Sequence, residues 1–307
     1  MFLHEDPGLF RDIIEAASAS QNNRPISIIE KDYYVTMILK LLSEEAPGCV
    51  FKGGTSLSKC HHAIDRFSED IDITFSDTLT QGQRKNLKNK TIAGISQKLH
   101  LPITDWENTR SRRDYNCYTF AYTPIEGFIQ KSLVPGVKME VSLGSISFPT
   151  IQLPVSNYIY EFLSGENKNI ADEYGLNPFI MTLQSLERTF ADKVFAICDY
   201  FLEGNIKRHS RHIYDLYMLY PRITLNDEYK ALVKKIRTHR AKMSICPSAQ
   251  PEIDINNILA KIIHDDVYRN DYEEITSYFQ NYPIAYTDVI EVLEKIIQSG
   301  VFSTFGN

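Results

Sequence analysis

The chain has 307 residues, 43% of them hydrophobic, so it can bury one large core or two modest ones. Its formal net charge of -6 argues against a protein that coats nucleic acid through bulk positive charge, and any nucleic-acid partner must meet a local basic patch. The five cysteines form no C-x-x-C pair, which argues against a disulfide framework or a zinc knuckle. No export signal and no run of roughly 20 apolar residues is found, so a cytoplasmic protein without a membrane partner is expected.

In chain order, the predicted elements begin with a helix that Asp6 caps and Pro7 opens, because Asp accepts from free first-turn amides. Apolar residues at helical spacing predict helices at 7–14, 28–42 and 183–202. The segment 55–64, after the glycine turn, and the polar, basic segment 81–99 are also expected to be helical. Alternating or β-branched runs predict strands at 50–51, 71–75, 115–122, 137–143 and 151–155. Beyond about residue 185 the pattern is almost wholly helical. The prediction is an α+β protein with a core over 1–170, including the N-terminal helices, and a helical lobe over 171–307.

Two carboxylates in the predicted strand at 71–75 and just before it form the first chemical motif. Asp70 and Asp72 are two residues apart, and a strand projects such residues to the same side. Hard oxygen ligands suit Mg²⁺, which usually takes one or two protein carboxylates and keeps positions for water and substrate phosphate. The same D-x-D pattern also fits a solvated strand edge or a pair of caps.

A glycine turn lies upstream of this pair. The strand ending at Gly53-Gly54 opens into a helix, which would let backbone amides approach phosphate oxygens, with Thr55 and Ser56 as hydroxyl donors. An ordinary strand-to-helix turn that needs glycine at positive φ is the alternative. A phosphate cradle and a carboxylate pair within one short segment are more informative together than either is alone.

Glu140 is the third candidate carboxylate. It lies on the polar side of the predicted strand at 137–143, opposite Val137, Met139, Val141 and Leu143. It could act as a metal ligand or as a general base. A solvent-facing residue on an amphipathic strand would show the same pattern.

Charged side chains also interrupt apolar helix faces, where a charge needs a partner. Lys31 lies among apolar residues of the second helix with Asp32 beside it, which predicts a buried ion pair or a reach toward the site. Glu187 falls within the apolar face of the helix at 183–202, and Lys193 lies at its border. Lys193 could neutralise a triphosphate as a point charge. Alternatively, its aliphatic stem could pack on the core while its charge reaches solvent.

Together these motifs resemble the AbiEii/AbiGii toxin family, which comprises nucleotidyltransferases of bacterial type IV toxin-antitoxin systems. The resemblance covers roughly residues 25–220 and rests on K-G-G-T-x-L-x-K from Lys52 and R-x-S-x-D-x-D from Arg66. Its remaining parts are Glu30-Lys31-Asp32 and the later residues Glu187, Lys193, Arg208, Arg211, Tyr214 and Asp215.

The resemblance implies a polymerase-β-like nucleotidyltransferase core with a mixed sheet, followed by a mostly helical C-terminal lobe. By position it implies that Asp70, Asp72 and Glu140 are catalytic and hold Mg²⁺ or Mn²⁺, and that Lys193 and Asp215 are needed for activity. The residues implied to bind the nucleoside triphosphate are Gly53, Gly54, Thr55, Ser56, Lys59, Arg66 and Ser68. One departure is that Arg211 is followed by His212, where the family signature has Asp. Arg211 and Asp215 are also spaced as an ordinary i,i+4 surface pair.

The implied reaction moves a nucleoside monophosphate from an NTP to an acceptor hydroxyl on a tRNA, another RNA 3' end or a protein. The protein would act as a toxin or in phage defence, and a cognate antitoxin encoded nearby would restrain it. A metal-dependent nuclease is an alternative, because D-x-D ligation fits phosphodiester hydrolysis too. A catalytically inactive nucleotide-binding or partner-binding module is another. The candidate surface for an RNA acceptor is the basic set Arg84, Lys85, Lys88, Lys90, Arg110, Arg112 and Arg113, which also fits a solvated helix and loop.

Overall fold

The computed structural model describes residues 1–66, 68–125, 135–243, 245–280 and 282–303. Phe67, which lies inside the R-x-S motif, falls outside the described residues. The contacts divide the chain into two compact units. The core unit comprises Met1–Cys60 and Ser68–Leu183, and the helical unit comprises His61–Phe67 and Gln184–Asn307. The predicted domain boundary near residue 170 stays a prediction.

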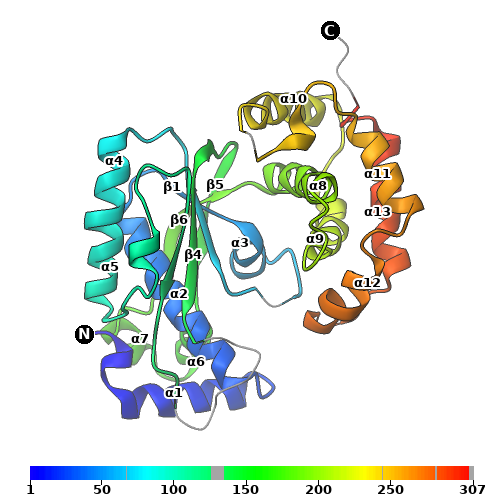
Figure 1. Ribbon diagram of the computed structural model, residues 1–307. Coiled ribbons are helices and arrows are strands. Elements are labelled where there is room, and N and C mark those ends of the chain that lie inside the picture. Colours follow the sequence, from blue (N-terminus) through cyan, green and yellow to red (C-terminus); the bar gives the residue numbers. More distant parts are fainter. Residues whose placement is uncertain (67, 126–134, 244, 281, 304–307) are drawn as a thin grey trace. The chain divides into compact units, whose positions relative to one another are not determined.

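A mixed sheet of six strands forms the centre of the core unit (Figure 1). The strands are β1 (Cys49–Lys52), β2 (Ile71–Phe75), β3 (Tyr115–Phe120), β4 (Val137–Ile146), β5 (Thr150–Val155) and β6 (Phe179–Gln184). Their order in space is β3-β4-β2-β1-β6-β5. β2 runs antiparallel to β1 and parallel to β4, and β3 runs antiparallel to β4. The predicted α+β class with a mixed sheet and a helical C-terminal part is confirmed.

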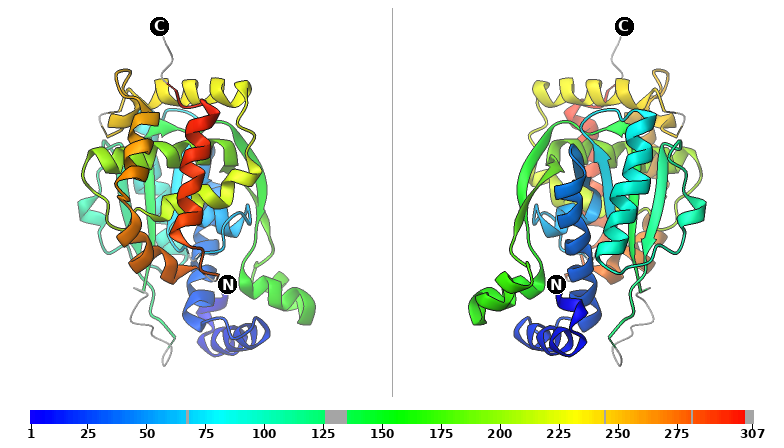
Figure 2. Two further views of the ribbon diagram at one scale, coloured as in Figure 1. Left: turned by 90° about the vertical axis from the view of Figure 1, so that its right-hand side faces the viewer. Right: turned by 90° about the vertical axis from the view of Figure 1, so that its left-hand side faces the viewer.

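Helices cover both faces of this sheet. In the core unit they are η1 (Leu3–Glu5), α1 (Pro7–Ser20), α2 (Ile26–Glu45), α3 (Gly53–Lys59), α4 (Gln81–Asn86), η2 (Leu87–Ile92), α5 (Ala93–Lys98), η3 (Trp106–Asn108), α6 (Tyr158–Glu166) and α7 (Lys168–Glu173). α2, α4 and α5 lie on one face and α3 on the other, while α1 packs on α2 and α6 (Figures 1 and 2). The predicted cap is present, because the Asp6 carboxylate accepts a hydrogen bond from the Leu9 amide at 3.1 Å.

Alternation along the central strands separates an apolar face from a polar face. In β2, Ile71, Ile73 and Phe75 are buried, while Asp72 between them is only partly buried. In β4, Val137, Met139 and Val141 are buried in the same alternating way. The apolar face packs in the main core, so the polar positions of both strands share the opposite face.

Two differences from the predicted elements have local causes. α3 ends at Lys59 and not at 64, because the chain soon adopts a left-handed backbone at His62, with φ 47°, which a helix does not continue through. β6 was not predicted, because its burial does not alternate regularly and Ile180 is 59% exposed. α6 and α7 were also missed.

The helical unit consists of α8 (Leu186–Leu202), α9 (Arg211–Leu219), η4 (Tyr220–Arg222), α10 (Asp227–Arg240), η5 (Pro247–Ala249), α11 (Ile255–His264), α12 (Arg269–Asp271), η6 (Tyr272–Thr276), η7 (Ser277–Phe279) and α13 (Tyr286–Ser299). α8 packs on α9, and α11 lies beside α13 (Figure 2). Across both units, no helix within the described ranges has the length and apolar character that a membrane crossing requires.

Candidate active site

Four side chains form a row across the polar face of the sheet. Lys52 of β1 pairs in register with Asp72 of β2, Asp72 pairs with Glu140 of β4, and Glu140 pairs with Cys117 of β3. Directly paired residues project to the same face, so one cation, two carboxylates and a thiol are neighbours on adjacent strands. All four residues are partly buried. We call Lys52, Asp72, Glu140 and Cys117 the carboxylate row.

The charges of Asp70, Asp72 and Glu140 affect the pKa values of neighbouring side chains on β3. Burial raises the pKa of the Cys117 thiol to about 11, with further contributions from the negative charges of Glu140 and Asp70. Burial and the charges of Glu140 and Asp72 likewise raise the pKa of the Tyr115 phenol. Tyr115 therefore stays protonated at neutral pH and can donate to Glu140. Negative charge concentrates along this part of the sheet.

The chemistry of these oxygen donors fits a divalent cation. Asp70 lies one residue before β2 and Asp72 within it, while Glu140 is the register partner of Asp72. Among the described residues, no three His, Cys, Asp or Glu side chains are gathered tightly enough to form a ready metal cluster. A cation held by one or two of these carboxylates and by substrate oxygens is the usual arrangement for Mg²⁺. Asp70, Asp72 and Glu140 as its ligands stay a prediction.

Gly53 makes room for the Asp72 carboxylate. Gly53 has a φ of 80°, a conformation that favours glycine. A Cβ atom built on Gly53 would overlap the carboxyl group of Asp72. The first glycine of the K-G-G-T motif is therefore needed both for the backbone conformation and for the place of a candidate metal ligand.

The hydroxyl groups that follow this turn form local hydrogen bonds. The Thr55 and Ser68 hydroxyl oxygens lie 3.0 Å apart, which joins the two sequence motifs. Ser56 is fully buried and donates to the Gly53 carbonyl oxygen at 2.9 Å. Gly54 lies in the first turn of α3. The predicted contacts of these residues with phosphate stay a prediction.

Two ion pairs connect α2 to the same motifs. Lys31, which is 4% exposed, pairs with Glu69, the residue before Asp70. Asp32 accepts from Lys59 Nζ at 2.5 Å. The predicted buried ion pair of Lys31 is confirmed. The Lys59 ammonium, predicted to bind the nucleotide, is held by Asp32 in the structure.

A buried charge cluster lies in the helical unit. Asp215 is fully buried and accepts two hydrogen bonds from Arg66, from Nε at 2.7 Å and from Nη2 at 2.8 Å. Lys193, which is 6% exposed, donates to the same carboxylate at 2.5 Å. The alternative of an exposed i,i+4 pair between Arg211 and Asp215 is wrong, because Asp215 has no exposed surface. We call Arg66, Lys193 and Asp215 the buried triad.

Burial and charge act in opposite directions within the buried triad. Burial acts to raise the pKa of Asp215, but the charges and hydrogen bonds of Arg66 and Lys193 outweigh it and hold that pKa below its ordinary value. Burial lowers the pKa of Lys193, and Asp215 offsets only part of this effect. Two cations share one carboxylate, so the triad carries net positive charge when all three groups are ionised.

Two neighbouring residues differ from expectation or from the family pattern. Glu187 was expected within an apolar face, but it is exposed in the first turn of α8, where a negative charge suits the helix dipole. Within the described part of the chain, neither ring nitrogen of His212 has a hydrogen-bond partner. Burial lowers the pKa of His212, and the nearby Lys193 and Arg211 add to this effect, so its ring stays neutral.

The structure therefore groups the predicted residues in two sets. The carboxylates, the glycine turn and its hydroxyl groups lie in the core unit, whereas the buried triad lies in the helical unit. Sequence analysis included Lys52 in the glycine motif but missed Tyr115 and Cys117 as site neighbours. Strand alternation places Tyr115 and Cys117 on one face, but only the strand order brings them beside Glu140.

A comparison with protein families identifies the family of this chain. The family model described as nucleotidyl transferase AbiEii toxin, type IV toxin-antitoxin system, matches residues 38–291. A comparison with curated proteins gives no match. The matched range contains the carboxylate row, the glycine turn and the buried triad. The chain belongs to the AbiEii family of nucleotidyl transferase toxins of type IV toxin-antitoxin systems.

Proposed function

We propose that this protein transfers a nucleoside monophosphate from an NTP to an acceptor hydroxyl with the help of Mg²⁺ or Mn²⁺. The acceptor is an RNA 3' end, such as that of tRNA, or a protein. The acceptor oxygen bonds to the α-phosphorus, the bond from that phosphorus to the bridging oxygen breaks, and pyrophosphate leaves. Family membership supports the reaction class.

The carboxylate row is the observation that carries this proposal. Asp72 and Glu140 lie side by side on adjacent strands, and Asp70 precedes Asp72 by two residues. Gly53 leaves the space that the Asp72 carboxylate occupies. When bound here, a divalent cation would neutralise phosphate charge and stabilise the charge that develops during transfer. An ordinary solvated strand edge would not require a neighbouring glycine against one carboxylate.

The surroundings of Glu140 support a role for it in proton transfer. A general base must be ionised and within reach of the proton that it accepts. Burial and the charges of Glu140 and Asp72 raise the pKa of Tyr115, so this phenol stays protonated and does not compete with Glu140 for the proton. Glu140 would accept the proton of the acceptor hydroxyl while Asp70 and Asp72 bind the cation.

The net positive charge of the buried triad supports a role for Lys193 with an anionic substrate. Lys193 and Arg66 together contribute two cations, and Asp215 contributes one anion. A buried lysine needs a partner for its charge in any role, and here two cations share the single carboxylate of Asp215. We propose that this net positive charge attracts the negatively charged triphosphate.

Exposed arginines support an RNA acceptor. Arg110, Arg112 and Arg113 are exposed just before β3, and Lys85 and Lys90 are exposed at α4 and η2. Arg84 is paired with Asp114 at 2.8 Å, and the Lys88 ammonium lies 4.5 Å from the centroid of the Trp106 ring. The exposed members are therefore the ones that we expect to contact RNA phosphates.

The proposal is tested by incubating the purified chain with each α-labelled NTP, total RNA, cell extract and Mg²⁺. Label incorporated into RNA or protein, together with equimolar pyrophosphate, is the expected result. RNA cleavage without incorporation would indicate a nuclease, and nucleotide binding without turnover would indicate an inactive binding module. Either result would contradict the proposed transfer. Expression under a regulated promoter, with and without the neighbouring antitoxin gene, tests the toxin role.

A further inference from the structure

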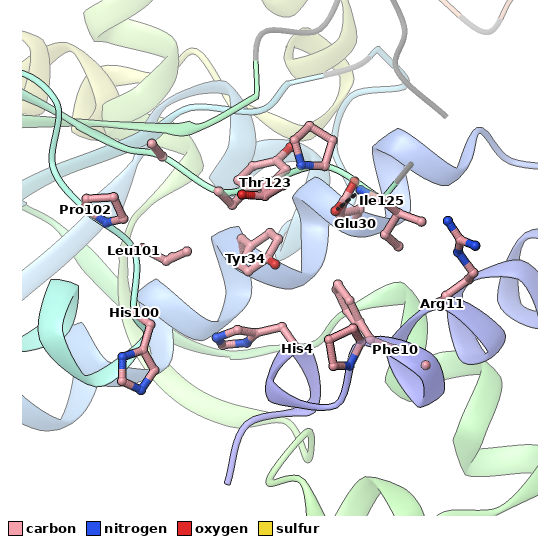
Figure 3. Close-up of a pocket in the computed structure, with 15 residues that line it drawn as sticks. His4, Phe10, Arg11, Glu30, Tyr34, His100, Leu101, Pro102, Thr123 and Ile125 are labelled. Carbon is pink, nitrogen blue, oxygen red and sulfur yellow. Dashed lines mark hydrogen bonds between the residues drawn. The ribbon is translucent and has the colours of Figure 1, made fainter. Parts of the chain in front are cut away.

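A cavity of about 700 Å³ lies in the core unit apart from the carboxylate row (Figure 3). Its walls come from η1, α1, α2 and the segments 100–102 and 121–125. None of the four residues of the carboxylate row lines it. Its volume is within the range of about 300–1,000 Å³ that is typical of small-molecule sites.

Aromatic rings form much of the wall. The rings of Tyr34 and Tyr122 are stacked, with centroids 4.4 Å apart, and Phe10 lies 6.0 Å from Tyr34. Both ring nitrogens of His4 are engaged, by the Tyr33 hydroxyl at 2.8 Å and by the Leu99 carbonyl at 3.0 Å. Such walls favour a ligand with a flat apolar body, and electron-rich ring faces also attract organic cations.

One acidic side chain, Glu30 of α2, contributes to this aromatic wall. Figure 3 shows Glu30 above Tyr34 and beside Ile125. Glu30 is 2% exposed, and one of its carboxyl oxygens accepts a hydrogen bond from the Ile125 amide at 3.1 Å. Burial raises the pKa of Glu30 to about 7. In the described part of the chain, no Lys, Arg or His forms an ion pair with Glu30.

A buried carboxyl group without a protein cation is costly when ionised, and a bound cation would remove that cost. A flat amidinium or guanidinium group can donate two parallel hydrogen bonds to a carboxylate. Arg11 also lines the cavity, but its side chain is exposed, so solvent screens its charge.

We propose that this cavity binds a small organic cation that has an amidinium or guanidinium head for Glu30 and a flat apolar body for Tyr34 and Tyr122. This site is additional to the proposed transfer reaction and does not depend on it. Glu30 precedes Lys31 and Asp32, whose ion pairs reach the catalytic motifs. The test therefore measures ligand binding and not transfer.

Benzamidine and benzamide are suitable probes, because they have nearly the same shape and only benzamidine carries a charge. Calorimetric titration of the full chain in metal-free buffer should show saturable benzamidine binding with a Kd of about 1 mM or lower. Benzamide should bind at least about tenfold more weakly. Glu30→Gln should reduce benzamidine affinity to that of benzamide, and Tyr122→Leu should weaken the binding of both probes. Glu187→Gln, an exposed control of the same chemistry, should bind like the unmodified chain.

Thermal unfolding of each variant separates loss of binding from loss of fold. If Glu30→Gln does not fold, the Tyr122→Leu variant and the preference of the unmodified chain for benzamidine still decide the proposal. It is overturned if benzamidine does not bind saturably, if both probes bind equally well, or if a folded Glu30→Gln variant keeps the preference.

Discussion

Replacing Gly53 by alanine adds one methyl group at the point where the glycine turn meets Asp72. At φ 80° the new residue would adopt a backbone that costs about 1–2 kcal/mol for a residue with a side chain. Its Cβ would also overlap the Asp72 carboxylate, so either the turn or that side chain must move. Displacement of a catalytic group by about 1 Å can lower the rate roughly a hundredfold.

We therefore expect Gly53→Ala to lose about two orders of magnitude in transfer and to lower the unfolding temperature by a few degrees, at about 2–4 °C per kcal/mol. Incorporation of α-label measures the first effect, and thermal unfolding measures the second. Gly82→Ala is the matched control. Gly82 lies in α4, where an added Cβ would meet no atom within 4 Å, so the variant should keep full activity and gain up to about 1 kcal/mol. Near-normal transfer by Gly53→Ala would refute the role that we assign to the turn.

Three further predictions concern the carboxylates, the buried triad and the basic surface. Asp72→Asn and Asp70→Asn should each reduce transfer at least about a hundredfold while keeping the fold, because each loses a ligand charge; near-normal transfer by a folded variant would contradict the site. The lowered pKa of Asp215 means that its stabilising effect is present above the ordinary carboxyl range near pH 4 and is lost as the pH falls below it. Asp215→Asn should therefore lower the unfolding temperature at pH 7, by an amount corresponding to about 3–5 kcal/mol, and should flatten the acid branch; an unchanged pH profile of unfolding would contradict this. Replacing the exposed arginines Arg110, Arg112 and Arg113 by alanine should raise the Michaelis constant for acceptor RNA much more than that for NTP. The salt dependence of RNA binding should also decrease. Equal effects on both Michaelis constants would exclude this surface as the RNA site.

The sequence predicts local features of the site well. Alternation alone places Asp72 and Glu140 on the polar sides of their strands, and both assignments are confirmed. Asp70, Asp72 and the glycine turn are also close in sequence, so a single motif contains them. Their roles in catalysis stay predictions.

Long-range relations could not be predicted from these patterns. β2 and β4 are distant in sequence, and their register follows from the whole sheet, so the pairing of Asp72 with Glu140 is visible only in the structure. Helical spacing suggests Arg211 as a partner for Asp215, but the carboxylate is buried and paired with Arg66 and Lys193. A pattern that compares residues within one helix cannot reveal a partner from a distant segment.

The central claim is transfer of the α-phosphoryl group, and parallel reactions with α-labelled and γ-labelled NTP test it most directly. With Mg²⁺ and total RNA, the α-label should enter the acceptor in proportion to the pyrophosphate released. The γ-label should appear only in pyrophosphate, and Asp72→Asn should abolish both signals. Entry of the γ-label into the acceptor, release of α-labelled monophosphate without acceptor labelling, or equal transfer by Asp72→Asn would contradict nucleotidyl transfer at the carboxylate row.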